Sequence, residues 1–173
     1  IAAVAAELSR VGWTGPRPRW RFVGHLQRNK ARRAVAVFDR FDSVDSAPLA
    51  ALLDRLVEPA DGPLRVLLEV NVTGDPGRTG FAVDTVVDAA GELLELPGLA
   101  PEGLMAIGPH TADVGAQRAA FETLRTLRAD LAARYPSRAW PSLSMGMSDD
   151  FEAAIAEGST AIRIGRALFG PEG

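Results

Sequence analysis

Short apolar stretches alternate with longer amphipathic segments along this chain of 173 residues. Each short stretch predicts a buried strand, and each segment with apolar residues three or four positions apart predicts a helix. The clearest strand is Leu64–Val72, because its nearly continuous apolar run is typical of a parallel sheet covered on both faces. Six strands are predicted, at Trp20–Val23, Phe38–Val44, Leu64–Val72, Gly103–Ile107, Pro141–Met147 and Ala161–Ile164.

A helix, or the start of one, follows each predicted strand. Helices are expected at Gln27–Val37, Pro48–Leu56, Ala82–Leu96 and Asp113–Arg134, after Ser148 and after Gly165, and the tail of another at Ala2–Arg10. Strict alternation of this kind implies a parallel sheet with right-handed crossovers. Two architectures have this property, an open doubly wound sheet and an eight-stranded barrel.

The number of units favours the barrel. A (β/α)8 barrel of the TIM type has eight units and at least about 200 residues, whereas this sequence has six units. The chain also opens at Ile1 rather than at a methionine, inside a helical pattern. We therefore expect residues 1–173 to be a single barrel domain that holds strands 3 to 8 and is incomplete at its N-terminus, with two open sheet edges.

The closing stretch, Leu143–Gly170, contains the strongest candidate site. Ser148 is expected to cap a helix whose first turn holds acidic residues. Two successive strand ends, each followed by a helix N-terminus, direct free N–H groups toward one point, which suits a phosphate. Arg163 and Gly165 share one strand face, so the guanidinium can hold a polar ligand ring while the glycine lets phosphate approach. The alternative, in which Arg163 only bridges barrel layers or pairs with an acid, stays open.

Other segments offer weaker candidates. His25 directly follows a predicted strand, where it could contact a ligand or serve the structure alone. The basic run Gln27–Arg33 could contact RNA or phosphate, or form a solvated helix face. Glu69 and Asn71 share one face of a buried strand and need partners or a ligand there. The glycine-rich stretch after them departs from the nucleotide-binding pattern, and we expect a mobile loop whose Arg78 swings over a ligand.

Composition narrows the function classes. The net charge of −3 and 47% hydrophobic content describe a soluble globular chain with no general affinity for nucleic acid. Without cysteine there is no disulfide, thiolate or zinc–cysteine site, which fits a cytoplasmic protein. No apolar run is long enough for a membrane span. Lys30 is the only lysine, so any lysine chemistry within this chain has one candidate.

Four motifs together resemble a known family. They are WRFVGHLQRNKAR at Trp20–Arg32, LEVNVTGDPGRTGF at Leu68–Phe81, GLMAIGP at Gly103–Pro109 and LSMGMSDDFEAAIAEGSTAIRIGRALFG at Leu143–Gly170. In this order they closely resemble the pyridoxal phosphate homeostasis proteins, whose fold is similar to the N-terminal barrel of alanine racemase (fold type III of the proteins that use this cofactor).

The resemblance implies a cytoplasmic, monomeric barrel that binds pyridoxal 5'-phosphate (PLP) through a lysine Schiff base. It implies no catalytic activity, and a role in buffering the cofactor or delivering it to PLP-dependent apo-enzymes. It implies no partner among nucleic acids or membranes. The alternative is a PLP-dependent racemase or decarboxylase of related fold, although such enzymes add a second domain that this sequence lacks.

The resemblance also assigns residues. Ser148, Gly165 and Arg166 would surround the phosphate, and Arg163 would face the pyridine nitrogen. The remaining pocket residues would be His25, Asn71 and Met145.

The sequence departs from the family pattern in several places. Arg21 stands where members usually have histidine, Arg78 where many members have lysine, and Arg166 where members often have threonine. The family's Schiff-base lysine and its Phe-Gly-Glu-Asn motif belong to the two units not found here, and Lys30 matches a different lysine. We therefore expect the chain to keep the phosphate half of the site without the covalent attachment.

Overall fold

The computed structural model describes residues 2–170. Its helices are α1 (Ala2–Arg10), α2 (Ala31–Val35), α3 (Ala47–Asp54), α4 (Val86–Leu94), α5 (Val114–Arg134), α6 (Phe151–Ala156) and α7 (Arg166–Phe169), with short 3-10 turns η1 (Arg28–Lys30) and η2 (Pro59–Asp61). Its strands are β1 (Arg21–Phe22), β2 (Arg40–Val44), β3 (Leu64–Glu69), β4 (Leu99–Met105), β5 (Ser142–Met147) and β6 (Ala161–Arg163). In this part of the chain no helix combines the length and apolar character needed to cross a membrane.

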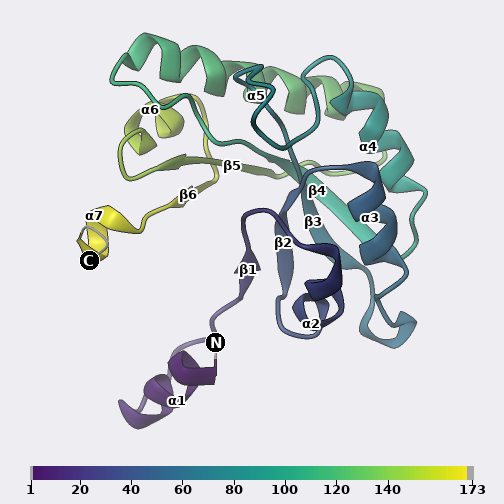
Figure 1. The fold of residues 1–173 in the computed structure, drawn as a ribbon, viewed down its shortest axis with the longest axis vertical. Helices are drawn as coiled ribbons and strands as arrows, with labels where there is room; N and C mark the ends of the chain where they lie inside the picture. The colour runs from purple at the N-terminus through teal and green to yellow at the C-terminus, as the bar shows by residue number, and fades with distance from the viewer. Residues whose placement is uncertain (1, 171–173) are drawn as a thin grey trace.

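The strands form one parallel sheet in the order β1-β2-β3-β4-β5-β6. A doubly wound sheet reverses its strand order at a switch point, so the sequential order confirms the barrel prediction. The sheet curls, with α3, α4, α5 and α6 on its outer side, and its two edge strands β1 and β6 face an open side (Figure 1). Helix α1 stands apart from this body at the end of an extended segment (Figure 1).

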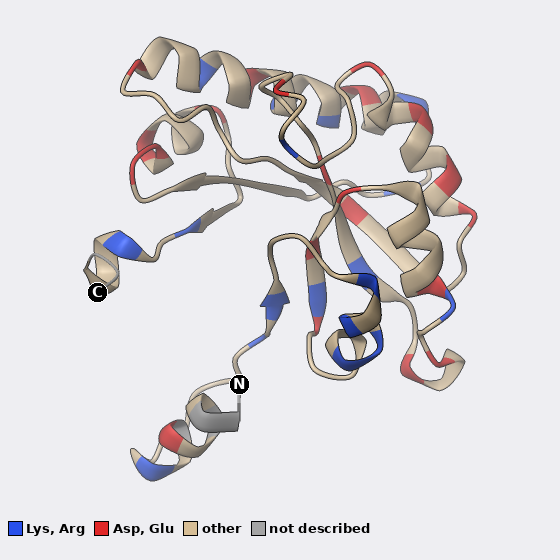
Figure 2. Ribbon diagram, viewed as in Figure 1, with Lys and Arg blue, Asp and Glu red and all other residues tan. Residues whose placement is uncertain are grey.

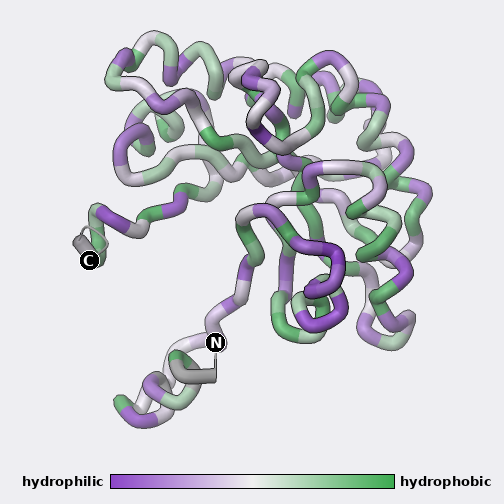
Figure 3. The backbone as a smooth tube through the Cα atoms, in the orientation of Figure 1, coloured by the Kyte–Doolittle hydropathy of each residue, from purple (hydrophilic) through white to green (hydrophobic). Residues whose placement is uncertain are grey.

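Alternating side chains divide each central strand between two environments. On β3, the outward residues Val66 and Leu68 are fully buried in the same hydrophobic cluster as Val86, Ala90 and Leu93 of α4. The most hydrophobic parts of the tube follow the central strands and the inner sides of the helices (Figure 3). The hydrophobic core therefore lies between the sheet and its helices, outside the barrel.

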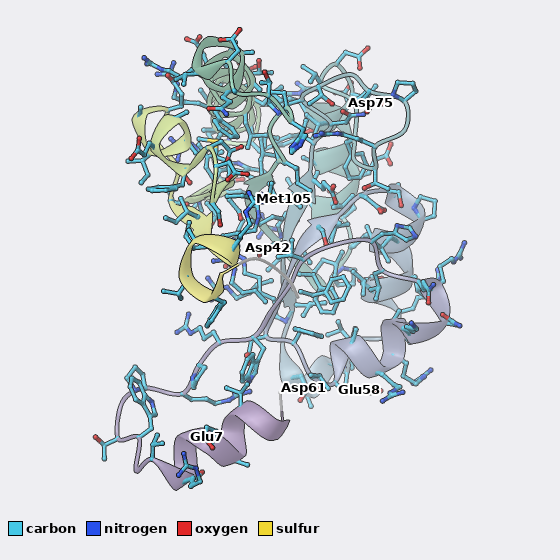
Figure 4. All side chains as sticks on the ribbon, turned by 60° about the vertical axis from the view of Figure 1, so that its left-hand side comes forward. Glu7, Asp42, Glu58, Asp61, Asp75 and Met105 are labelled. Carbon is cyan, nitrogen blue, oxygen red and sulfur yellow. The ribbon has the colours of Figure 1, made fainter. Side chains whose placement is uncertain are left out.

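The inner face of the sheet carries a charged network. Asp42 on β2 lies 2.5 Å from Arg21 and 3.0 Å from Arg40, measured between carboxylate oxygen and guanidinium nitrogen. Glu102 on β4 lies 3.2 Å from Arg40 and 2.6 Å from Arg65. Burial lowers the pKa of Arg40, and the neighbouring carboxylates oppose this effect. Basic residues lie along β1, α2 and β2 (Figure 2), and the buried Asp42 lies within the curl of the sheet (Figure 4).

Several predicted boundaries need correction. Strand β4 begins at Leu99 rather than Gly103, because Leu99–Pro101 already pairs with β3. The predicted helix Gln27–Val37 is only the turn η1 followed by the short α2, and neither has a side-chain cap. Strand β6 is not buried as expected, since Ile162 on this edge strand is 39% exposed. The apolar face expected for the first helix is half exposed at Val4, and Ile1 lies outside the described residues.

Candidate functional site

The carboxyl ends of the six strands lie at one end of the curled sheet, where parallel barrels bind their ligands. In Figure 4 this end is marked by Asp75, which follows β3, while Glu58 and Asp61, which precede β3, mark the opposite end. The predicted residues Ser148, Gly165, His25 and Asn71 all follow strand ends at the first of these ends. The topology therefore gathers most of the sequence candidates in one region.

Ser148 joins the last two units, although not as predicted. The residue that precedes α6 is Asp150, whose carboxylate accepts a hydrogen bond of 2.5 Å from the Met147 N–H. Ser148 instead accepts a hydrogen bond of 3.1 Å from the N–H of Ala167 in α7. The helix-cap prediction for Ser148 was therefore wrong, because the hydroxyl turns across to the following unit.

An open cradle lies beside this contact, formed by the Ser148 hydroxyl and the backbone of Gly165 and Arg166. Within residues 2–170, no acceptor is recorded for the N–H groups of Gly165 and Arg166. A Cβ added at Gly165 would meet no heavy atom within 4 Å. A hydroxyl and two unused N–H groups around open space have the donor chemistry that a phosphate requires.

Arg163 crosses the interior next to this cradle. Its guanidinium donates to the carbonyl and hydroxyl oxygens of Ser144, at 3.0 and 2.9 Å, and to the carbonyl of Ala106 at 2.9 Å. A guanidinium has five N–H donors, so two remain for a ligand. Burial lowers the pKa of Arg163, while Asp42, Asp150 and Glu69 favour its charged form from a distance.

The sequence left two purely structural roles open for Arg163, bridging barrel layers or pairing with an acid, and its contacts distinguish them. It does bridge strands, through Ser144 and Ala106, but no carboxylate in the described part of the chain lies within ion-pair distance of it. Its role toward the pyridine nitrogen stays a prediction. The sequence analysis did not predict Ser144 as a partner of Arg163. The one feature that could have indicated it is its position on the inner face of β5.

The other predicted residues are less closely associated. Arg166 is exposed and forms an ion pair with Asp149, which raises its pKa. The His25 ring lies 3.1 Å from the Asp45 carboxylate and is largely exposed. Met145 is fully buried in the hydrophobic core outside the barrel, so the structure does not bring its side chain to the cradle.

Asn71 organises the loop that follows β3. Its amide donates to the carbonyl of Asp75 at 2.7 Å and accepts from the Thr73 hydroxyl at 2.9 Å. Arg78 in the same loop donates to the carbonyls of Ile107 and Gly108, at 3.2 and 2.9 Å. The expectation that Arg78 swings freely was therefore wrong, because its guanidinium is bound to the segment after β4.

Glu69 ends β3 on the inner face and is only 6% exposed. Thr79 donates to its Oε1 at 3.2 Å, whereas its Oε2 has no hydrogen-bond partner among the described residues. It lines a cavity of about 220 Å³ together with Asn71, Arg78 and Ile107. Burial is the largest influence on this carboxyl and raises its pKa.

We expect Glu69→Gln to stabilise the folded chain at neutral and alkaline pH. Because the folded pKa lies above the ordinary value of 4.5, the folded chain holds the proton more tightly, and stability from this group is lost as the pH rises through the folded pKa. The gain in the free energy of unfolding should be about 1 kcal/mol near pH 8 and should disappear at low pH. Urea unfolding across this range measures it; the exposed Glu92→Gln should change nothing, and a pH-independent difference for Glu69→Gln would contradict the expectation.

Comparisons with known proteins identify the family. The model of the alanine racemase N-terminal domain matches residues 2–173. The pyridoxal phosphate homeostasis protein of Pseudomonas aeruginosa is 44% identical over 151 residues, which are 87% of this chain and 64% of that relative, so the chain spans less than two thirds of its length.

Solved structures agree with this assignment. PipY of Synechococcus elongatus PCC7942, with PLP bound, is 36% identical with a TM-score of 0.83, over 98% of this chain and 76% of PipY. Alanine racemase of Clostridium difficile 630, at 16% identity and a TM-score of 0.70 over 97% of this chain and 44% of that one, shows the fold alone. The resemblance carried by the four motifs is thereby confirmed: the chain is similar to the pyridoxal phosphate homeostasis proteins, and it belongs to the alanine racemase N-terminal domain family.

Proposed function

We propose that this chain binds pyridoxal 5'-phosphate and serves PLP homeostasis by buffering or delivering the cofactor, without catalysing a reaction. Residues 1–173 would act as one barrel domain, monomeric and cytoplasmic, with PLP-dependent apo-enzymes as recipients. The function rests on one feature, the open cradle at Ser148 and Gly165 beside the carboxylate-free guanidinium of Arg163. The names of the relatives support it, as does the PLP-bound structure of PipY.

The residues present fit the cofactor. The unused N–H groups of Gly165 and Arg166 and the Ser148 hydroxyl would hold the phosphate. The free N–H groups of Arg163 would donate to the pyridine nitrogen, and a permanent cation there keeps the ring unprotonated. When bound, PLP supplies an electrophilic carbonyl and an electron-withdrawing ring, and an unprotonated ring withdraws electrons less strongly. The site thus suits holding the cofactor better than using it.

Binding measurements on cradle variants test this function. We expect the chain to bind PLP reversibly, and Ser148→Ala and Gly165→Ala each to weaken binding about tenfold, because the first removes a hydrogen bond to a charged group and the second fills the phosphate space. Equilibrium dialysis with absorbance detection gives the dissociation constants. Ser137→Ala, an exposed serine before β5, is the matched control and should bind as the unsubstituted chain does.

Covalent attachment is tested separately. After incubation with PLP and borohydride, intact mass and peptide mapping should show no specific adduct at Lys30, which lies in η1. An adduct there, or unchanged binding by both cradle variants, would contradict the proposed site.

The alternative is a PLP-dependent amino-acid racemase or decarboxylase. The shared fold with alanine racemase supports this alternative at the level of architecture only. Racemisation and decarboxylation assays with common amino acids distinguish the two functions, since turnover at enzymatic rates would overturn the carrier proposal.

A further inference from the structure

The cradle gives no role to the carboxyl of Glu69, which is buried in the interior. Glu69 is more than nine-tenths buried, and its Oε2 faces no hydrogen-bond partner in the described part of the chain. The residue lines the 220 Å³ cavity under the loop that follows β3. A buried polar atom without a partner is costly and calls for a ligand or a change of protonation state.

The charges around Glu69 decide between these possibilities. From other elements, Asp45 raises its pKa, and Arg163 and His25 lower it. From the loop after β3, Thr79 donates to it, and Arg78 lines the same cavity; Ile107, at the end of β4, adds no charge. A cationic ligand would have to share this small cavity with Arg78. The Oε2 atom of Glu69 has no partner among the described residues and the residue lines the cavity, and burial raises the pKa of this carboxyl, so a ligand oxygen that can share a proton with Oε2 is the better match.

The bound cofactor would present such an oxygen. This step rests on the proposed function, with the phosphate at Ser148 and Gly165 and the ring nitrogen at Arg163. In the ring of pyridoxal phosphate, one carbon separates the nitrogen from the carbon that bears the phosphate arm. The carbon that bears the hydroxyl lies directly across the ring from that separating carbon. With both of those groups held by the β5 and β6 units, the hydroxyl oxygen would point away from these units, toward the side of the sheet that contains β3 and Glu69.

We propose that Glu69 is a cofactor-contacting residue whose neutral carboxyl donates a hydrogen bond to the ring hydroxyl oxygen of pyridoxal phosphate. That oxygen readily carries negative charge, so a neutral carboxyl attracts it and an ionised one repels it. The affinity for PLP should therefore decrease as the pH rises and Glu69 ionises, so that release of the cofactor is favoured in more alkaline conditions.

The test compares dissociation constants for PLP between about pH 6 and 9. Glu69→Gln keeps an N–H donor but cannot ionise, so it should bind about as tightly as the unsubstituted chain at the acidic end and severalfold more tightly at the alkaline end. Glu69→Met removes the donor and should bind about tenfold more weakly at the acidic end. The absorbance spectrum of bound PLP, which reports ionisation of the ring hydroxyl, should also change in Glu69→Met.

Two controls make the test specific. Glu102→Gln neutralises another carboxyl of the interior, bonded to Arg65, and should keep the pH dependence of the unsubstituted chain. The analogue that lacks the ring hydroxyl, 3-deoxypyridoxal phosphate, should bind Glu69→Met and the unsubstituted chain alike. Thermal unfolding of each variant confirms that binding is measured on folded protein.

The outcomes separate the two proposals. If the unsubstituted chain binds PLP and both Glu69 variants match its affinity and pH dependence, the contact is overturned and the proposed function stands. The contact is likewise overturned, and the proposed function stands, if Glu102→Gln removes the pH dependence of binding as fully as Glu69→Gln does. If the unsubstituted chain does not bind PLP at all, the proposed function and the contact fail together.

Discussion

Replacing Asp42 with alanine is expected to lower the free energy of unfolding by about 3 kcal/mol or more. The carboxylate is 1% exposed and is the shared partner of Arg21 and Arg40. Arg40 is itself only 11% exposed, and its remaining partner is Glu102. Removing one partner of a buried ion pair leaves an uncompensated charge in a medium of low dielectric constant, which costs far more than the pair contributes.

Urea unfolding of the variant measures this loss. Asp130→Ala is the matched control, because Asp130 lies exposed on α5, and it should change stability by less than about 0.5 kcal/mol. Equal stabilities of the two variants would show that the charged network on the inner face does not depend on Asp42.

Replacing Gly103 with alanine should be at least as damaging. Gly103 has a φ of +152°, and a Cβ at this position would lie 1.9 Å from the carbonyl oxygen of Ser142 on the neighbouring strand. That oxygen belongs to backbone paired in register with Gly103, so relief requires β4 and β5 to separate. Backbone strain and overpacking together predict a loss of about 3 kcal/mol or more.

The control for this prediction is Gly165→Ala. Gly165 has a φ of −117°, and its added methyl group would meet open space, so stability should change by less than about 0.5 kcal/mol. Chemical unfolding of both variants, with the yield of folded protein as a second measure, distinguishes them. A Gly103→Ala protein as stable as Gly165→Ala would mean that the strands tolerate the methyl group.

Gly103 also shows why part of the fold escaped prediction. Between Val66 and Leu68 of β3 lies one residue, whereas between their partners Pro101 and Leu104 lie two, so β4 contains a bulge at Glu102 and Gly103. The apolar run after Gly103 was readable as a strand, but the pairing of Leu99–Pro101 depends on a neighbour more than 30 positions earlier. The barrel architecture was predictable because every strand and helix leaves a local periodic signal.

The same distinction applies to the site. Asp113 was correctly predicted to begin the long helix, because its carboxylate accepts from the N–H groups of Gly115 and Ala116, two and three positions on. The partner of Ser148 lies 19 residues away, and the carbonyl of Gly108 lies 30 residues from Arg78. Capping rules consider only residues a few positions apart, so they cannot predict such distant partners. The motifs did indicate the region in which these residues lie.

The sequential order of the strands has a consequence for how the protein is made. Each strand pairs only with those next to it in the sequence, so each β/α unit can add to the edge of the sheet as the chain emerges from the ribosome. The cradle, in contrast, needs Ser148 and the start of α7 together. A nascent chain therefore completes the cradle only after the β6 unit has been synthesised, and earlier folding intermediates lack the donors that we propose for the phosphate.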